Sequence, residues 1–182
     1  SNTAIGLASS GTGNIASFVT SNTTNAAISG LITVTPKYTN GGLTCSGTAK
    51  TFTITINPIP TVTKPTNQTI CVGSGTSTVT FGGSLVSNTV YTWTNNNTAI
   101  GLAASGTGDI ASFTTTNTTN APITATITVT PTYTNAGTTC SGPSQTFSFT
   151  VNPKPAIPDQ TVTTCTGSTF SFAAANSGST IV

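Results

Sequence analysis

Residues 123–134 read ITATITVTPTYT, and apolar residues alternate with threonine along most of this stretch. A period of two places one set of side chains on one face of a β-strand. The same alternation recurs in QTFSFTVNP at residues 145–153, where Phe147, Phe149 and Val151 share a face. Threonine and the other β-branched residues also favour strands over helices. Both stretches are therefore predicted to form half-buried strands.

Three shorter stretches follow the same pattern: TSTVTF (76–81), VYTWT (90–94) and IASFTTT (110–116). Turn compositions such as GSG, NNN and TTNAP separate the predicted strands. Six or seven short strands in about 95 residues, with the single tryptophan on an early central strand, predict an all-β, two-sheet sandwich of immunoglobulin-like architecture. The residues that we expect in its core are Trp93, Phe113 and Phe147.

The predicted strands belong to a sequence that repeats itself. Residues 1–60 align with residues 96–155 without a gap, and 41 of the 60 positions are identical. A third copy begins at residue 156, and its VTTCTGS (162–168) aligns with QTICVGS (68–74). Fixed self-similarity of this kind indicates a tandem array, and a period of about 95 residues has the size of an autonomous domain.

The alignment divides the chain into three segments. We expect the C-terminal part of one repeat at residues 1–60, a complete β-sandwich repeat at 61–155 and the N-terminal part of the next repeat at 156–182. Asn-Pro-x-Pro sequences at 57–60 and 152–155 mark the boundaries. Because proline fixes φ and extends the residue before it, these junctions predict a stiff, extended array. The sequence has no initiating methionine, so we expect a mature product or a piece of a longer chain.

Only 3% of the residues are charged, and histidine, glutamate, arginine and methionine are absent. A typical soluble domain has about 25% charged residues. Without a pair of groups for acid–base work or an activated nucleophile, the chain is not expected to be an enzyme. Isolated lysines exclude a nucleic-acid footprint, and no apolar run has the length of a membrane span. The charged residues are Lys37, Lys50, Lys64, Lys154, Asp109 and Asp159.

One motif resembles a cofactor site. GTGNIA (11–16) and GTGDIA (106–111) fit the Gly-x-Gly-x-x-Ala pattern of a dinucleotide loop. Such a loop leads into a helix and needs an acidic residue about 20 positions further on. Here a strand pattern follows each motif and neither copy has the acidic residue. The glycines therefore predict a tight turn, and no cofactor is expected.

An even number of cysteines favours disulfides, and the candidates are Cys45, Cys71, Cys140 and Cys165. Without histidine or a Cys-x-x-Cys sequence, no metal site is expected. Pairing within a repeat would join Cys71 with Cys140, and pairing across the linker would join Cys45 with Cys71 and Cys140 with Cys165. An immunoglobulin-like strand order, however, places Cys71 and Cys140 about 25 Å apart at ~3.3 Å per residue, and a disulfide tolerates Cα separations of about 7 Å. That order instead allows Cys71 to meet the counterpart of Cys140 in the following repeat. Pairing within a repeat remains the default expectation, and the staple between repeats is the second.

The stretches YTWTNNNTAIGLAASGTGDIASF (91–113), TCSG (139–142) and TFSFTVNPKP (146–155) are similar in order and wording to a known type of repeat. They resemble the PKD-like and Ig-like tandem repeats of giant cell-surface adhesins of gliding Bacteroidota. PKD repeats often contain Trp-x-Phe-Gly-Asp-Gly, whereas Trp93 is followed here by Thr-Asn-Asn, so the acidic turn is missing. The resemblance implies an extracellular, cell-surface or filament-forming protein and carries over no catalytic residue.

Together these features predict a structural stalk or filament module of a large secreted adhesin, which provides length and mechanical stability. The expected partners are neighbouring repeats of the same chain. Lateral or end-to-end self-association is also expected, because a nearly uncharged surface has little electrostatic repulsion. The alternative is a carbohydrate-binding or surface-binding module that grips polysaccharide through loops such as NNNTAIGLAASGTG (95–108).

Overall fold

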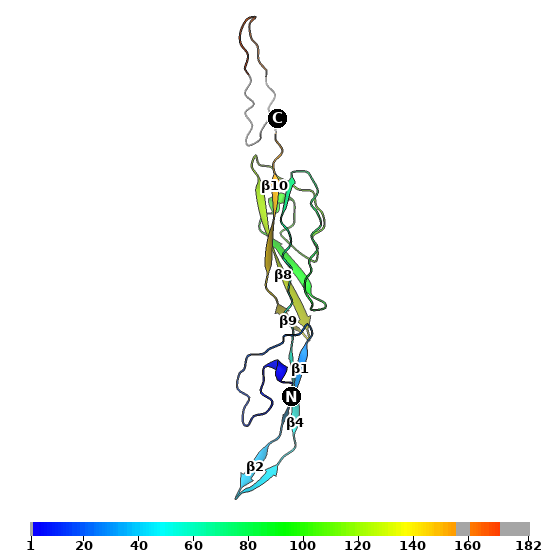
Figure 1. Ribbon diagram of the computed structural model, residues 1–182, viewed down its shortest axis with the longest axis vertical. Helices are drawn as coiled ribbons and strands as arrows, with labels where there is room; N and C mark the ends of the chain where they lie inside the picture. The colour runs from blue at the N-terminus through cyan, green and yellow to red at the C-terminus, as the bar shows by residue number, and fades with distance from the viewer. Residues whose placement is uncertain (1, 156–160, 172–182) are drawn as a thin grey trace. The chain divides into compact units, whose positions relative to one another are not determined.

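The computed structural model describes residues 2–155 and 161–171, and this part of the chain is all-β with two 3₁₀ turns and no α-helix (Figure 1). The remaining residues of the predicted third repeat, 156–160 and 172–182, lie outside the described residues. In chain order the elements are η1 (Thr3–Ile5), β1 (Ile28–Val34), β2 (Lys37–Asn40), β3 (Leu43–Ser46), β4 (Lys50–Ile56), β5 (Gln68–Cys71), β6 (Val90–Asn95), η2 (Thr98–Ile100), β7 (Ser105–Thr107), β8 (Ile123–Asn135), β9 (Thr138–Ser141) and β10 (Gln145–Asn152).

The main sheet has six strands in the order β5-β10-β8-β6-β7, with β9 paired to β8. β8 and β10 are antiparallel, so that Phe147 lies opposite Ile127 and Phe149 opposite Ala125. The alternation in the sequence is confirmed here. The fully buried residues are Ala125, Ile127 and Val129 in β8 and Phe149 and Val151 in β10. The threonines between them are more exposed. β5 adds a parallel strand along the outer edge of β10.

Two predicted strands, 76–81 and 110–116, form only isolated antiparallel bridges, Gly75 with Thr114 and Val79 with Ile110. Side chains take over backbone hydrogen bonds at both ends of this pairing. The Asp109 carboxylate accepts from the Phe81 amide at 2.9 Å, and the Thr76 hydroxyl accepts from the Phe113 amide at 3.2 Å. A regular ladder therefore does not extend along either segment.

These two segments supply the aromatic residues that pack on the main sheet. Phe113 contacts Phe149 edge to face with ring centroids 5.4 Å apart, and Phe81 contacts Phe147 at 6.3 Å. Phe147 and Phe149 contact each other at 5.5 Å. Of the three expected core residues, Trp93 and Phe147 are buried and Phe113 is half-buried.

Trp93 packs on Gly106, so we expect a larger residue at position 106 to lower the stability of the fold. A Cβ at Gly106 would lie 2.3 Å from an indole carbon of Trp93, its cross-strand neighbour. We expect Gly106→Ala to displace the ring and lower the free energy of unfolding by about 1–3 kcal/mol, with a red shift of tryptophan emission. Urea denaturation followed by circular dichroism measures the change. Gly82→Ala is the matched control, because a Cβ at Gly82 would meet nothing within 4 Å, and equal stability of the two variants would contradict the prediction.

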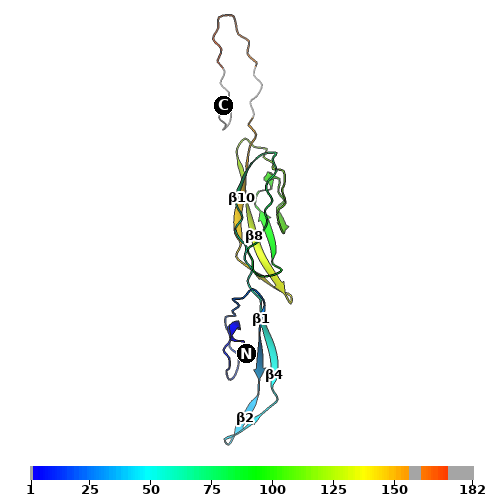
Figure 2. The ribbon, with the colours of Figure 1, turned by 45° about the vertical axis from the view of Figure 1, so that its right-hand side comes forward.

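The first sequence copy forms counterparts of most elements of the complete copy, although residues 10–12, the counterpart of β7, form no strand. β1 pairs β4 in an antiparallel, two-stranded sheet, and β2 pairs β3 (Figure 2). In the alignment β1 and β2 correspond to the two halves of β8, β3 to β9 and β4 to β10. The caps also correspond, since Asn2 accepts from the Ala4 amide at 3.1 Å in η1 and Asn97 accepts from the Ala99 amide at 3.2 Å in η2.

The described chain separates into two compact units. The first comprises residues up to 63 together with 82–91 and 130–144, and the second comprises 64–81, 92–129 and the residues from 145 onward. The first unit therefore extends beyond the sequence boundary at residue 60. It does so because the linker packs on the β8–β9 hairpin, where the carbonyl of Pro60 lies against Gly142 and both Pro58 and Pro60 are fully buried.

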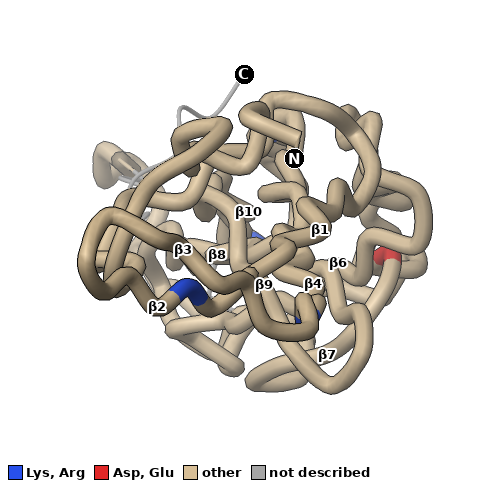
Figure 3. Tube along the Cα trace, turned by 90° about the horizontal axis from the view of Figure 1, so that it is seen from below, with Lys and Arg blue, Asp and Glu red and all other residues tan. Residues whose placement is uncertain are grey.

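Charged residues are sparse along the described part of the trace, as the isolated blue and red segments of Figure 3 show. The chain carries four lysines and two aspartates. Asp109 has the structural role described above, as acceptor for the Phe81 amide. Apart from this bond, the described part of the fold rests on apolar packing and on hydrogen bonds between uncharged groups.

Candidate functional site

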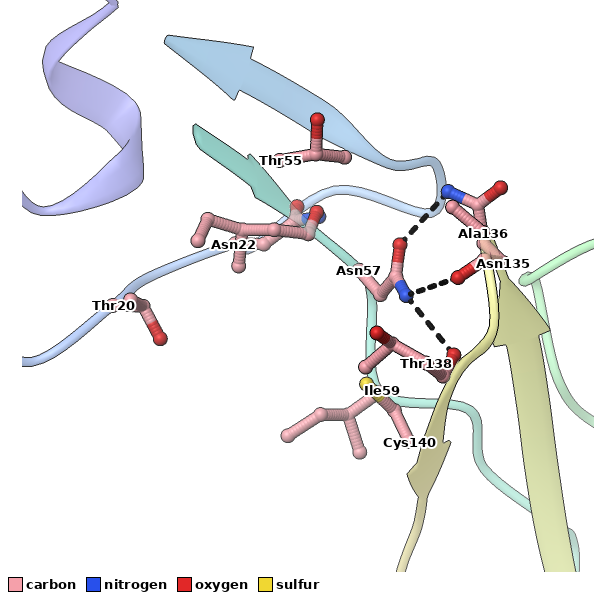
Figure 4. Close-up of a pocket in the computed structure, with 10 residues that line it drawn as sticks. Thr20, Asn22, Thr55, Asn57, Ile59, Asn135, Ala136, Thr138 and Cys140 are labelled. Atoms are coloured by element: carbon pink, nitrogen blue, oxygen red, sulfur yellow. Dashed lines mark hydrogen bonds between the residues drawn. The ribbon is translucent and has the colours of Figure 1, made fainter. Parts of the chain in front are cut away.

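A pocket of about 350 Å³ lies within the first unit (Figure 4). Its walls come from the loop before β1, the end of β4 with the linker that follows, and the hairpin between β8 and β9. The lining residues are Thr20, Asn22, Thr55, Ile56, Asn57, Ile59, Asn135, Ala136, Thr138 and Cys140.

Asn57 joins two walls of this pocket. Its side-chain amide donates to the carbonyl of Thr138 at 3.3 Å and to the carbonyl of Asn135 at 3.5 Å. The amide of Asn135 donates in return to the Asn57 side-chain oxygen at 3.0 Å (Figure 4). Asn57 is the first residue of the Asn-Pro-x-Pro linker, so the linker is fixed to the hairpin by side-chain amides as well as by its prolines.

Asn22 connects the loop before β1 with the end of β4. Its side-chain amide donates to the carbonyls of Ile56 and Ala26, both at 2.8 Å, and its oxygen accepts from the Thr24 amide at 2.9 Å. In the complete copy Asn117 makes the corresponding bonds to Val151, Ala121 and Thr119. The asparagine amides of the pocket are therefore engaged within the protein.

One edge of β4 borders the pocket, and among the described residues β4 pairs only with β1. The corresponding strand of the complete copy, β10, is paired on both sides, with β8 and with β5. The parallel register of β5 places Gln68 opposite Phe149 and Cys71 opposite Asn152. β4 thus presents the type of edge that is occupied by a strand in the complete copy.

Two hydrogen bonds hold the end of β5 in the complete copy. The Thr115 hydroxyl donates to the Cys71 carbonyl at 2.8 Å, and the Val72 amide donates to the Asn152 carbonyl at 3.0 Å. The counterparts of Thr115 and Asn152 in the first copy are Thr20 and Asn57, and both line the pocket. The pocket therefore lies where the end of a strand equivalent to β5 would bind.

The role of Thr115 can be tested directly. Its hydroxyl also donates to the Ser74 carbonyl at 3.1 Å, and its side chain is buried. Thr115→Val leaves both carbonyls without this donor, so we expect a loss of about 1–3 kcal/mol in the free energy of unfolding, measured by urea denaturation. Thr114→Val is the control, since Thr114 is exposed and valine already stands at its counterpart, Val19. A loss as large for Thr114→Val would contradict the assignment.

The pocket offers little chemistry beyond recognition of a peptide chain. None of its ten lining residues is charged, and Cys140 is its only thiol. No group of three histidine, cysteine or acidic residues that could hold a metal occurs in the part of the chain that the structure describes. What the site supplies is a strand edge, apolar side chains of two isoleucines and one half-buried thiol.

All four candidate cysteines are free thiols, with Cys140 half-buried and Cys45, Cys71 and Cys165 exposed. The default pairing of Cys71 with Cys140 is therefore not formed, nor are the two pairings across the linker. The strand register explains why Cys71 and Cys140 do not pair. Cys71 lies opposite Asn152, beside the start of β8, whereas Cys140 lies opposite Tyr133, ten residues further along the same strand. Ten residues of strand span about 33 Å, far beyond the reach of a disulfide.

The glycine motif has a structural role. Gly106 lies against the Trp93 ring, and the Gly108 carbonyl accepts from the indole nitrogen at 3.1 Å. Gly108 and its counterpart Gly13 both have positive φ, +74° and +81°, which glycine adopts at no steric cost. In the complete copy Gly106 and Thr107 belong to the strand β7, and the predicted turn is confined to the bend at Gly108.

The residues of the pocket were not among the sequence-based candidates, apart from Cys140. One signal for them existed, because Thr20, Asn22 and Asn57 are identical to Thr115, Asn117 and Asn152 in the other copy. That signal is weak in a chain so rich in threonine and asparagine.

No helix among the described residues is long and apolar enough to cross a membrane. No family model, curated protein or solved structure matches the chain.

Proposed function

We propose that the chain is a structural stalk or filament module of a large secreted bacterial surface adhesin, made of tandem immunoglobulin-like or PKD-like β-sandwich repeats and located at the cell surface. One observation carries the proposal: where the two sequence copies align, residues that pack are kept and charged residues are not. Each buried position between residues 96 and 155 has an identical, apolar or small counterpart in the first copy, as Ile100 has Ile5 and Phe149 has Ile54.

The charged residues show the opposite behaviour. Lys37, Lys50 and Lys154 correspond to Thr132, Gln145 and Ile59, and Asp109 corresponds to Asn14. A catalytic or charge-dependent binding role would require these groups at equivalent positions. Repetition of packing without repetition of charge supports a role in which the copies provide length and rigidity.

The strand order also supports a load-bearing role. In the complete copy the first strand, β5, and the last strand, β10, are parallel neighbours. A pull applied through the two ends of this copy acts on opposite ends of the β5–β10 ladder, because the strands run in the same direction. The hydrogen bonds of the ladder are then loaded together in shear and not broken one after another.

Single-molecule force measurements on the 182-residue chain, held at its two termini, test this proposal. We expect a discrete unfolding event that releases about 300 Å, since Gln68–Asn152 spans 85 residues and an extended residue spans at most ~3.6 Å. The control attaches the handles at residues 122 and 153, where the start of β8 and the end of β10 lie side by side, so that this pair of strands unzips. A lower force for the control supports the proposal, and equal or immeasurable forces in both geometries would overturn it.

The carbohydrate-binding alternative has less support from the loop that was expected to carry it. The Asn95 side chain donates to the carbonyls of Leu102 and Ala103, and the Asn97 side chain donates to the Thr124 carbonyl. These amides are bonded within the protein, to the loop itself and to β8, whereas a sugar site needs polar groups that point outward. Retention of the chain on an array of bacterial polysaccharides would favour this alternative over the structural role.

A further inference from the structure

The linker between the two sequence copies is held by the copy that follows it. Residues 57–60 (NPIP) end the first copy, but they pack on the β8–β9 hairpin of the complete copy, within one compact unit. The Asn57 side chain shares three hydrogen bonds with Asn135 and Thr138 (Figure 4), and both prolines of the linker are fully buried. The hairpin therefore has an occupant, and that occupant is a short segment of defined sequence.

Gly142 follows β9 and lies against the linker. A Cβ at this position would collide with the carbonyl of Pro60. Gly142 does not have a positive φ, and its amide donates to the Pro131 carbonyl at 2.9 Å, so its backbone conformation does not itself require glycine. The close approach of the linker is what requires glycine here.

The residue between the two prolines behaves differently from its neighbours. Ile59 is 63% exposed, although it stands between two fully buried prolines. In the alignment of the copies, the asparagine and both prolines of the linker recur at 152–155, whereas Ile59 is replaced by Lys154. The residues that the hairpin holds are therefore the ones that the two linkers share, and the variable residue faces solvent.

The tip of the hairpin is held in a strained conformation beside this contact. Ala136 has a φ of +47°, a left-handed value that its counterpart, Gly41, adopts without steric cost. Such strain persists where surrounding contacts hold the backbone. The amide pair between Asn57 and Asn135 lies next to Ala136 and provides such a contact.

We propose that the β8–β9 hairpin is a recognition site for an Asn-Pro-x-Pro segment, and that docking of the first copy's linker there stabilises the complete copy. The site binds the asparagine through backbone carbonyls of the hairpin and the two prolines through burial. Because proline fixes φ, the segment is partly ordered before it docks and loses less conformational entropy. Linker and hairpin belong to one chain, so the docking is intramolecular and benefits from a high effective concentration.

Two strands connect the docking site to the rest of the complete copy. β8 belongs to both compact units, since its residues 130–135 lie in the first unit and 123–129 in the second. The Thr132 hydroxyl donates to the carbonyl of Val90 at 3.2 Å, and Val90 begins β6, the strand that carries Trp93. Loss of the docked linker is therefore expected to reach the environment of Trp93. In a tandem array, contacts of this kind make the stability of one repeat depend on its neighbour.

This docking deepens the structural role proposed above, because it names the contact through which one copy supports the next. Its test is separate from the force measurement, which loads the β5–β10 ladder. A copy whose stability ignores the linker could still resist a pull. Conversely, copies coupled through the linker could still unfold at low force.

A double-mutant cycle on the amide pair tests the docking. In the full 182-residue chain, urea denaturation is followed by the fluorescence of Trp93, which lies in the complete copy. Asn57→Ala is expected to raise the unfolding equilibrium constant about tenfold, although the replaced residue belongs to the first copy. Asn135→Ala should raise it less, because it removes one of the three bonds. The double variant should show less than the product of the two effects, since both replacements remove the same pair.

Asn22→Ala is the matched control for Asn57→Ala. The Asn22 side chain also donates two hydrogen bonds to backbone carbonyls, at Ile56 and Ala26, but both partners belong to the first copy. We expect the transition reported by Trp93 to stay within about twofold of the original constant.

A second pair of variants tests the sequence that the hairpin recognises. Gly142→Ala should displace the carbonyl of Pro60 and raise the unfolding constant at least about fivefold. Ile59→Lys should leave it within about twofold, because the side chain is exposed and lysine stands at the same place in the other linker. The asparagine variants add no bulk to the hairpin, so they decide the question if Gly142→Ala does not fold. Equal effects of Asn57→Ala and Asn22→Ala, effects that simply multiply in the double variant, or a large effect of Ile59→Lys would each overturn the proposal.

Discussion

Replacement of Phe149 with alanine is expected to lower the free energy of unfolding of the complete copy by about 3–5 kcal/mol. The Phe149 side chain is fully buried, and its ring contacts Phe113 and Phe147. Its cross-strand neighbour is Ala125, which is too small to fill the space that the ring would leave. Urea denaturation followed by the fluorescence of Trp93 measures the loss, because Trp93 is the only tryptophan and lies in the complete copy.

Ile54→Ala provides the matched control. Ile54 is the counterpart of Phe149 in the first copy, where it is only half-buried in the two-stranded sheet. Because sites that share no partner act independently, the transition reported by Trp93 should stay within about 0.5 kcal/mol of the original. A loss below about 1 kcal/mol for Phe149→Ala would show that the two phenylalanines of β10 are not central to the core.

The second large effect is expected from Ile70→Pro. The Val72 amide donates to the Asn152 carbonyl of β10. Because successive amides of a strand point to opposite sides, the Ile70 amide points to β10 as well. Proline lacks this donor and cannot join a ladder on that side. We expect a loss of about 3 kcal/mol or more in stability and a clear drop in the unfolding force when the chain is held at its termini. Both effects are expected because, in the proposed role, a pull on the two ends of the complete copy loads the parallel β5–β10 ladder.

Thr69→Pro separates loss of a hydrogen bond from the general effect of proline. β5 is the last strand of its sheet, and the Thr69 amide points to the open side. Proline is tolerated at such positions of edge strands, so the unfolding force should change little. Equal forces for the two proline variants would contradict the shear mechanism, whatever their stabilities.

Three strands of the main sheet, β6, β8 and β10, could be predicted from the sequence because their alternation is clear, whereas the short strands β5, β7 and β9 show no such alternation. β8 and β10 formed close to their predicted bounds. Segments 76–81 and 110–116 have the same alternation, yet they form isolated bridges because Asp109 and Thr76 accept backbone hydrogen bonds there. Competition between a side chain and a ladder depends on tertiary placement, which the pattern of apolar residues does not contain.

The site could be predicted only in part, for a different reason. Cysteine count and spacing identified Cys140 but not its surroundings, because the pocket is made by segments more than 80 residues apart in sequence, around Asn57 and Thr138. The register of β5 and β9 on the sheet then excluded the bond from Cys71 to Cys140 within one repeat. Register follows from how strands are ordered in space, and a list of strands does not give that order.

The parallel pairing of β5 with β10 also determines when this fold can form. The two strands are separated by about 80 residues, so closing the loop between them costs about 4 kcal/mol of chain entropy before their contacts form. Contacts between such distant segments make folding slow. While a copy is being made, its first strand has no partner until its last strand is complete. Each copy therefore remains open to misassociation through its first strand for most of its synthesis, and its folding completes in one late step.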